Sequence, residues 1–139
     1  MKRLPLLVLG VGLLAATGSA MAANEFMTSI PSDSVTVTDW YKQNVYDPQN
    51  NKIGQIMDVL VSPDGKVNSL IVGVGGFLGA GEKDVAVGFD AVKRTTKDNS
   101  VHLTMNTNKD ALQSAPGFRY DRQTTKWVRD TSKGNNASQ

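Results

Sequence analysis

The part of the chain that comes nearest to a chemical motif is a glycine-rich stretch, residues 73–81. A dinucleotide-binding pattern G-x-G-x-x-G beginning at Gly73 would require glycine where Leu78 stands. A P-loop would require Gly-Lys-Ser/Thr, whereas Gly81 is followed by Glu82. We therefore interpret these glycines as residues that let the backbone turn tightly and approach neighbouring strands, and we do not expect phosphate binding.

His102 is the only histidine, so any catalytic triad or imidazole base would have to use it. The alternation of residues 100–105 places it on the face opposite Val101 and Leu103, which favours a solvated histidine on a strand. The chain has no G-x-S-x-G or H-E-x-x-H motif, and it has no cysteine for a metal cluster. We predict no catalytic, cofactor-binding or metal-binding residues.

The acidic residues Asp58, Asp84 and Asp90 are scattered over separate elements, and their spacing forces no two carboxylates together. Asp58 stands between Met57 and Val59, which indicates a partly buried position. A carboxylate in such a position usually accepts structural hydrogen bonds. We expect that role for Asp58 rather than acid–base catalysis.

Phe77 and Leu78 form an apolar pair between glycines at the tip of the glycine-rich stretch. Such a pair either folds over the end of the domain or is offered to a partner. The sequence leaves both possibilities open, and we take Phe77 and Leu78 as candidate partner-binding residues.

The segment after residue 117 interleaves the aromatic residues Phe118, Tyr120 and Trp127 with arginine and lysine. Aromatic stacking combined with basic groups is one way to hold single-stranded nucleic acid. Here Asp121 and Asp130 offset half of the local positive charge, so we expect a C-terminal extension whose aromatic residues pack on the domain. Contact with a partner is the alternative, which makes Tyr120 and Trp127 further candidate residues.

The first 22 residues have the pattern of an export signal. Lys2 and Arg3 precede an apolar run over residues 4–16, and small residues at 19–22 predict cleavage after Ala22. The apolar run is too short for a confident membrane span. We expect a periplasmic protein with no stable membrane span after cleavage. Secretion, or tethering by an uncleaved signal, is the alternative.

Cleavage would change the charge of the protein. The whole chain has 15 Lys+Arg against 13 Asp+Glu, and Lys2 and Arg3 leave with the signal, so the mature chain has 13 of each. A neutral chain has no overall electrostatic attraction to nucleic acid, and we expect none as a partner. Its length suits one domain over residues 35–118, with a flexible leader at 23–34 and an extension at 119–139 that is disordered toward its end.

The hydrophobic pattern predicts an all-β protein with one short helix. Short strands separated by turn residues about every ten positions are typical of a barrel or a sandwich. In residues 53–61, Met57, Val59 and Val61 should share one face and Ile56 and Leu60 the other. Thr107 should cap the helix, which ends before Pro116. The predicted strands cover residues 35–38, 44–47, 53–61, 67–74, 84–89 and 100–105, with polar turns including 95–99.

Several of these segments resemble the PRC-barrel family over about residues 38–118. The resemblance is carried by residues 45–47 with 52–54 and Asp58, by residues 63–66, and by residues 72–79 with Gly81, 83–87 and Phe89. It implies a small antiparallel PRC-type β-barrel with one short C-terminal helix. Gly88 stands where the family often has proline, which should loosen that strand locally. The family's motif carries no catalytic residues, and its members mostly act as assembly or docking modules.

We therefore expect a non-enzymatic periplasmic protein that docks onto an unidentified envelope protein or complex and needs no cofactor. A second possibility is a barrel mouth that holds a small apolar or anionic ligand, with Lys83 and Arg94 as nearby candidates. A third is an enzyme of unrecognised type.

Overall fold

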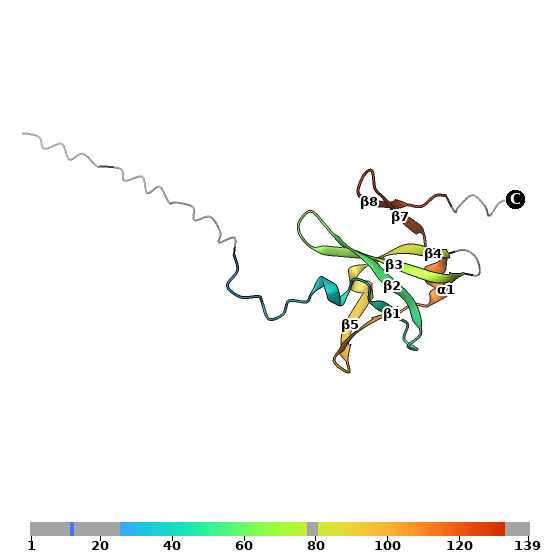
Figure 1. The fold of residues 1–139 in the computed structure, drawn as a ribbon, viewed down its shortest axis with the longest axis horizontal. Coiled ribbons are helices and arrows are strands. Elements are labelled where there is room, and N and C mark those ends of the chain that lie inside the picture. Colours follow the sequence, from blue (N-terminus) through green and yellow to red (C-terminus); the bar gives the residue numbers. More distant parts are fainter. Residues whose placement is uncertain (1–11, 13–25, 78–80, 133–139) are drawn as a thin grey trace, which may run out of the picture. The chain divides into compact units, whose positions relative to one another are not determined.

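The computed structural model describes residues 12, 26–77 and 81–132 and divides the chain into two units, residues 1–34 and Val35–Gln139. The second unit contains every described strand (Figure 1). Within the described part of the chain, no helix has both the length and the apolar character needed to cross a membrane. The predicted signal at 1–22 lies outside the described residues except for Gly12 and stays a prediction.

The domain is mostly β, with little helix. Two 3-10 turns, η1 (Val37–Asp39) and η2 (Phe89–Ala91), and one α-helix, α1 (Lys109–Ser114), accompany the strands. The strands are β1 (Asn44–Tyr46), β2 (Lys52–Val61), β3 (Val67–Phe77), β4 (Gly81–Gly88), β5 (Val92–Lys97), β6 (Ser100–Met105), β7 (Gly117–Asp121) and β8 (Lys126–Arg129).

All eight strands form one sheet in the order β5-β6-β1-β2-β3-β4-β7-β8. The sheet is not closed, so the prediction of a closed barrel is wrong for the described strands. The free edge of β4 pairs with β7, at Asp84↔Phe118 and Val85↔Gly117, rather than with β5. The sheet is also not purely antiparallel, because β1 runs parallel to β6.

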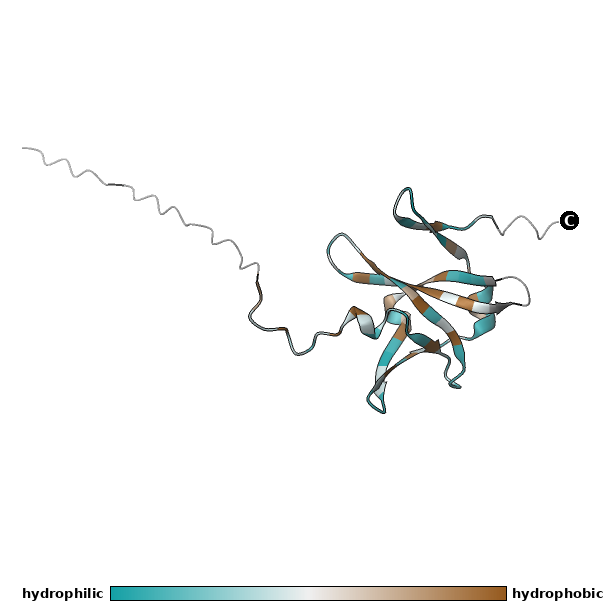
Figure 2. Cartoon of the chain, viewed as in Figure 1, coloured by the Kyte–Doolittle hydropathy of each residue, from teal (hydrophilic) through white to brown (hydrophobic). Residues whose placement is uncertain are grey.

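The hydrophobic core lies on one face of this sheet. Hydrophobic and hydrophilic residues alternate along the strands in Figure 2, as expected for a sheet that buries one face. The buried core residues come from strands β1 to β6, from α1 and from the residue that follows η1: Trp40, Val45, Ile53, Ile56, Leu70, Val72, Val74, Val85, Val92, Leu103 and Leu112.

A bulge in β2 changes the predicted alternation of that strand. The register passes from Ile56↔Val72 to Asp58↔Ile71, so Met57 is an extra residue without a partner. Ile56 lies in the core and Val59 packs against it, although the sequence pattern placed them on opposite faces. One inserted residue is enough to reverse the facing of every residue that follows it.

The hairpin between β2 and β3 was predicted correctly. Gly65 has φ +83° in the turn, and its N–H donates to the Ser62 carbonyl at 2.9 Å. Glycine adopts a positive φ without steric cost because it has no Cβ, which explains its place in this turn.

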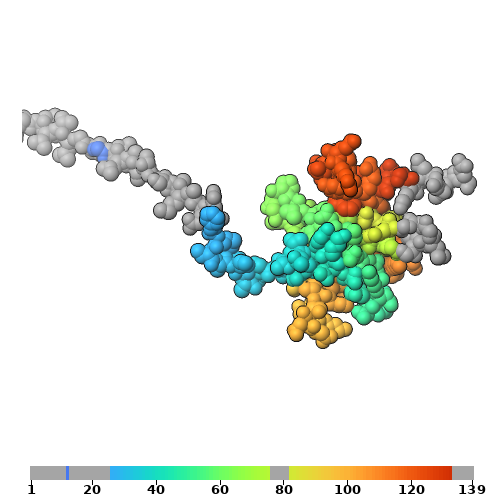
Figure 3. Space-filling model, in the orientation of Figure 1, coloured from blue at the N-terminus to red at the C-terminus, as the bar shows by residue number. Residues whose placement is uncertain are grey.

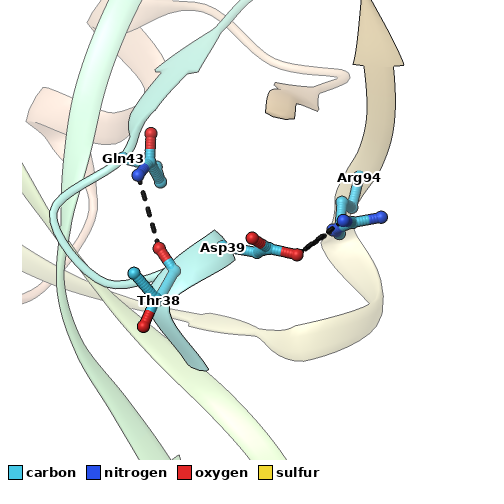
Figure 4. A network of polar contacts seen from close by, with 4 residues as sticks. All are labelled: Thr38, Asp39, Gln43 and Arg94. Atoms are coloured by element: carbon cyan, nitrogen blue, oxygen red, sulfur yellow. Dashed lines mark hydrogen bonds and ion pairs between the residues drawn. The ribbon is translucent and has the colours of Figure 1, made fainter. Parts of the chain in front are cut away.

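The predicted strand at 35–38 is wrong, because Val37–Asp39 forms η1 instead. Polar contacts fix this turn (Figure 4). Arg94 on β5 binds Asp39 Oδ2 through Nη2 at 2.5 Å and through Nε at 3.1 Å, and Gln43 Nε2 donates to the Thr38 carbonyl at 3.3 Å. The partner of Asp39 is 55 residues away, so no local pattern could reveal it.

The helix was predicted correctly, but its cap was not. Asn108, and not Thr107, is the N-cap, and its Oδ1 accepts the Ala111 N–H at 2.8 Å. Leu112 enters the core at 4% exposure. At the other end, Lys83 Nζ on β4 donates to the Gln113 carbonyl at 2.6 Å.

The C-terminal segment folds back as a hairpin of β7 and β8. Figure 3 shows its atoms, in red, beside those of the central strands. Trp127 Nε1 donates to Asp58 Oδ2 at 2.7 Å, so the hairpin reaches the face of β2 opposite the core. Ile71, the register partner of Asp58, is fully buried although it does not belong to the core cluster. The expected packing of the aromatic residues on the domain is thus confirmed for Trp127.

Candidate functional site

The outer face of strands β5, β6 and β1 carries a row of polar and aromatic side chains. Lys93 pairs with Thr104, and Thr95 pairs with His102, across the β5–β6 ladder. Paired residues in antiparallel strands share a face, and Leu103 between them is fully buried on the other side. The prediction that His102 lies opposite Leu103 is therefore confirmed.

His102 does not stand alone in solvent on this face. Tyr46 is the parallel-register partner of Thr104, and its ring stacks on the imidazole with a centroid distance of 4.8 Å and an interplanar angle of 17°. Both side chains are half-buried. The stack holds the imidazole in one orientation beside the β1–β6 pair.

A cleft of about 330 Å³ opens where β1 and β6 end. We call it the His102 cleft. It is lined by Asp47, Pro48, Asn50, Ala91, Lys93, His102, Thr104, Met105 and Asn106.

One wall of the His102 cleft is a turn built around the carboxylate of Asp47. This residue is only 7% exposed. Its Oδ1 accepts the backbone N–H groups of Gln49 at 2.9 Å and Asn51 at 2.8 Å, and its Oδ2 accepts Asn51 Nδ2 at 3.0 Å. The hydrogen bond from the Asn51 side chain, followed by that from its backbone, lowers the pKa of Asp47 below the usual aspartate value. Asp47 is therefore a structural anion bound within its own turn.

The other polar side chains of the cleft can each donate a hydrogen bond, and only that of Lys93 cannot also accept one. Lys93 contributes an ammonium group, Thr104 a hydroxyl and Asn106 an amide, while His102 contributes ring nitrogens. Among the residues that the structure describes, no group of three or more His, Cys, Asp or Glu side chains could hold a metal ion.

The two ligand-binding candidates from the sequence are engaged elsewhere. Lys83 caps the end of α1 through the Gln113 carbonyl, and Arg94 pairs with Asp39. Neither belongs to the His102 cleft. Sequence reasoning instead passed over Lys93, whose neighbour Arg94 carries the same charge but faces the other side of β5.

Asp58 has the structural role that was predicted for it. Its Oδ1 accepts the Val59 N–H at 2.8 Å, and its Oδ2 accepts the indole N–H of Trp127. No second carboxylate takes part in these two hydrogen bonds.

The four partner-binding candidates have different environments. Leu78 and the side chain of Phe77 lie outside the described residues, and their role stays a prediction. Trp127 is half-buried and hydrogen-bonded, whereas Tyr120 is 46% exposed and meets Trp127 edge-on at 5.7 Å. Of the two tail residues, Tyr120 is therefore the more exposed.

Three exposed valines lie near η1 and at the C-terminal end of β2, and they were not singled out from the sequence. Val35, Val37 and Val61 are 54%, 60% and 60% exposed. Val35 and Val37 border a small apolar groove of about 70 Å³, and Val61 is the register partner of Val67, which also lines it. We call this set the valine surface. The other residues lining the groove are Thr36, Trp40, Val59 and Phe89.

The family model described as the PRC-barrel domain matches residues 32–110, more than half of the chain. The chain belongs to the PRC-barrel family. No curated protein matches it. The matched range contains the His102 cleft and the valine surface, and it ends before the β7–β8 hairpin of this PRC-barrel protein. The family is generally non-catalytic.

Proposed function

We propose that this PRC-barrel protein is an exported, non-enzymatic module that docks onto another protein of the cell envelope. The observation that carries the proposal is the valine surface. Three β-branched aliphatic side chains are each more than half exposed; two line one apolar groove, and the third, Val61, pairs with Val67, which also lines it. Grouped exposed apolar residues are typical of interaction sites, whereas isolated ones are not.

The packing under the valine surface supports a preformed site. Trp40 and Phe89 lie beneath it with ring centroids 4.6 Å apart, and Trp40 is only 6% exposed. Because the Trp40 and Phe89 rings pack rigidly beneath them, the valines keep their positions in the free protein, which reduces the entropy lost on binding. The chemistry of the surface favours a partner that presents aliphatic side chains.

Export is part of this proposal and rests on the sequence pattern of residues 1–22. The periplasm is the proposed location. The charge balance of the mature chain agrees with docking by apolar contact, because a neutral chain gains little from long-range attraction.

Site-specific photocrosslinking in intact cells tests the docking. A photoreactive amino acid replaces Val61 in one strain and Lys97, an exposed residue of β5 outside the valine surface, in a control strain. We expect Val61 to crosslink to one discrete envelope protein and Lys97 not to do so. Equal products from both positions, or none from Val61, would contradict the proposal.

The variant Val37→Ser/Val61→Ser separates binding from folding. Because both side chains are exposed, each change should alter the free energy of unfolding by no more than about 0.5 kcal/mol. Binding of the crosslinked protein to the purified variant should nevertheless fall at least tenfold (about 1.4 kcal/mol). Retained affinity would show that the valines do not form the contact.

Phe77 and Leu78 are proposed as a second contact at the far end of β3. Replacing both with serine should abolish the capture of the envelope partner in a pull-down with this protein as bait, while leaving the melting temperature nearly unchanged. A large fall in melting temperature would show that the pair belongs to the core instead.

A further inference from the structure

The His102 cleft has a size and a chemistry that the docking proposal does not use. Its volume of about 330 Å³ lies at the lower end of the range for small-molecule sites, roughly 300–1,000 Å³. A cleft of this size suits a compact molecule rather than a polymer. It lies over β5, β6 and β1, whereas the valine surface lies over η1, β2 and β3.

One basic side chain, Lys93, and one carboxylate, Asp47, line the cleft, and they differ in how far they are already engaged. Lys93 is exposed and brings a full positive charge. The one carboxylate in the lining, Asp47, already accepts three hydrogen bonds from Gln49 and Asn51 within its own turn. A bound anion could therefore contact Lys93, the imidazole of His102 and the hydroxyl of Thr104. Lys93 takes part in neither of the ion pairs among the described residues, so no ion pair would have to break.

The cleft beside Lys52 and Lys109 differs on this point, because it also contains Glu82, an exposed carboxylate that would repel a bound anion. In the cleft beside Lys83 and Arg129, Asp130 accepts hydrogen bonds from Ser132, but Lys83 already donates to the Gln113 carbonyl. The His102 cleft combines basic and neutral donors with an acidic group that is already bound.

The cleft also offers apolar area to the body of a ligand. Pro48, Ala91 and Met105 contribute apolar atoms to its lining. The imidazole is held in place by its stack on Tyr46, so its orientation is set before a ligand arrives. A molecule with a small apolar part and one anionic group would use both halves of the lining.

We propose that the His102 cleft binds a small organic carboxylate. Its carboxylate pairs with the Lys93 ammonium and accepts hydrogen bonds from His102 and Thr104. Its apolar part lies against Met105, Ala91 and Pro48. The donors come from two paired strands, β5 and β6, which bring them to one face of the sheet.

The single histidine makes the test direct, because the imidazole Hε1 proton gives one resolvable NMR signal for the whole protein. The purified protein is titrated with benzoate, with the uncharged benzamide and with benzylammonium. We expect a saturable shift of the His102 signal with benzoate and no saturable shift with the other two compounds. A shift that grows linearly with benzoate, or an equal shift with benzamide, would overturn the proposal.

Two variants locate the binding. Lys93→Gln removes the charge while keeping a side chain of similar length at an exposed position, and it should weaken benzoate binding about tenfold, as expected for loss of a charge-assisted contact. Lys109→Gln changes the same type of residue in another cleft and should leave the affinity unchanged. Equal affinity of the wild type and Lys93→Gln would show that Lys93 holds no carboxylate.

Discussion

At the scale of single residues, one hydrogen bond decides the role of the aromatic tail. The indole N–H of Trp127 reaches Asp58 across 69 residues of sequence, at 2.7 Å. It supplies a donor to a half-buried carboxylate that would otherwise keep only the Val59 N–H. Trp127 is thus a structural residue, and Tyr120 alone stays available as the tail's candidate for contact.

Replacing Trp127 with phenylalanine should therefore destabilise the domain. The change leaves Asp58 Oδ2 without its donor, which should lower the free energy of unfolding by about 1–2 kcal/mol. Urea denaturation followed by circular dichroism measures this. The matched control is Tyr120→Phe, which alters an exposed ring and should change stability by less than about 0.5 kcal/mol. Equal effects of the two variants would contradict a structural role specific to Trp127.

Asp47 shows how a short turn stabilises a carboxylate. Its pKa is lowered chiefly by the side-chain hydrogen bond from Asn51. A carboxylate with a lowered pKa in the folded state contributes stability that is complete at neutral pH and is lost as the pH falls through that pKa. The contribution of Asp47 should therefore disappear in acid, below about pH 4.

The variant Asn51→Ala should raise the pKa of Asp47 toward the ordinary aspartate value, because it removes the largest cause of the shift. Carbon-13 NMR of the Asp47 carboxyl group measures the pKa. The difference in urea midpoint between wild type and variant should shrink as the pH falls below about 4. Gln49→Ala is the control, since Gln49 contributes through its backbone N–H, which the change retains. An unchanged Asp47 pKa in Asn51→Ala would refute this explanation.

At the scale of elements, the ends of α1 show why a short helix forms here. Six residues are too few to be stable alone in water. Asn108 satisfies the Ala111 N–H, Lys83 binds the Gln113 carbonyl, and Leu112 is buried in the core. Both ends and the apolar face therefore have partners.

Asn108→Ala should lower the free energy of unfolding by about 0.5–2 kcal/mol, the usual range for the loss of an N-cap. Thermal and urea unfolding both report it. Thr107→Ala tests the alternative cap that the sequence pattern favours, and it should have a smaller effect because Asn108 is the residue that bonds Ala111 N. A larger effect of Thr107→Ala would show that Thr107, and not Asn108, is the N-cap.

The turn between β5 and β6 could have been predicted more precisely from the sequence. Asp98 and Asn99 both have positive φ, +49° and +60°, as in a two-residue turn between antiparallel strands. Aspartate and asparagine tolerate this conformation better than most residues. Because residues 95–99 were predicted to be one polar turn, β5 was not predicted. The pairing of Lys93 with Thr104 was therefore missed as well.

At the scale of the whole molecule, the two proposed sites occupy different parts of one open sheet. The valine surface and the His102 cleft share no lining residue, so one can be changed without altering the other. The edge strand β5 carries Lys93, Arg94 and Lys97, and lysine on an edge discourages pairing with another sheet. Docking through side chains therefore fits this molecule better than addition of a strand at β5.

Export predicts a defined N-terminus. Mass spectrometry of the protein from the envelope fraction should find a mature chain that starts at Ala23, because Ala20 and Ala22 are the small residues that the peptidase reads. Leucine at both positions should block cleavage. Leucine at Ala16, within the apolar run, is the matched control and should leave processing intact. An envelope protein that keeps Met1 would indicate tethering by an uncleaved signal.

Much of this fold was readable from local sequence. Alternating residues predicted β1 within one residue and β6 at its exact bounds, while β3 runs three residues past its predicted end at Val74; turn residues located the hairpin at Gly65. The placement of His102 opposite Leu103 and the structural role of Asp58 also followed from local pattern. These features depend on neighbours in the chain and on period-two alternation, which a sequence displays directly.

Tertiary structure alone decided the rest. The pairing of β4 with β7 left the sheet open, and the bulge at Met57 brought Ile56 and Val59 to the same side. Arg94 donates hydrogen bonds to Asp39 across 55 residues of sequence, and Trp127 donates one to Asp58 across 69. The His102 cleft exists because β1 and β6 meet in parallel. Such contacts depend on how distant strands pack in space, and no local periodicity records which of them will meet.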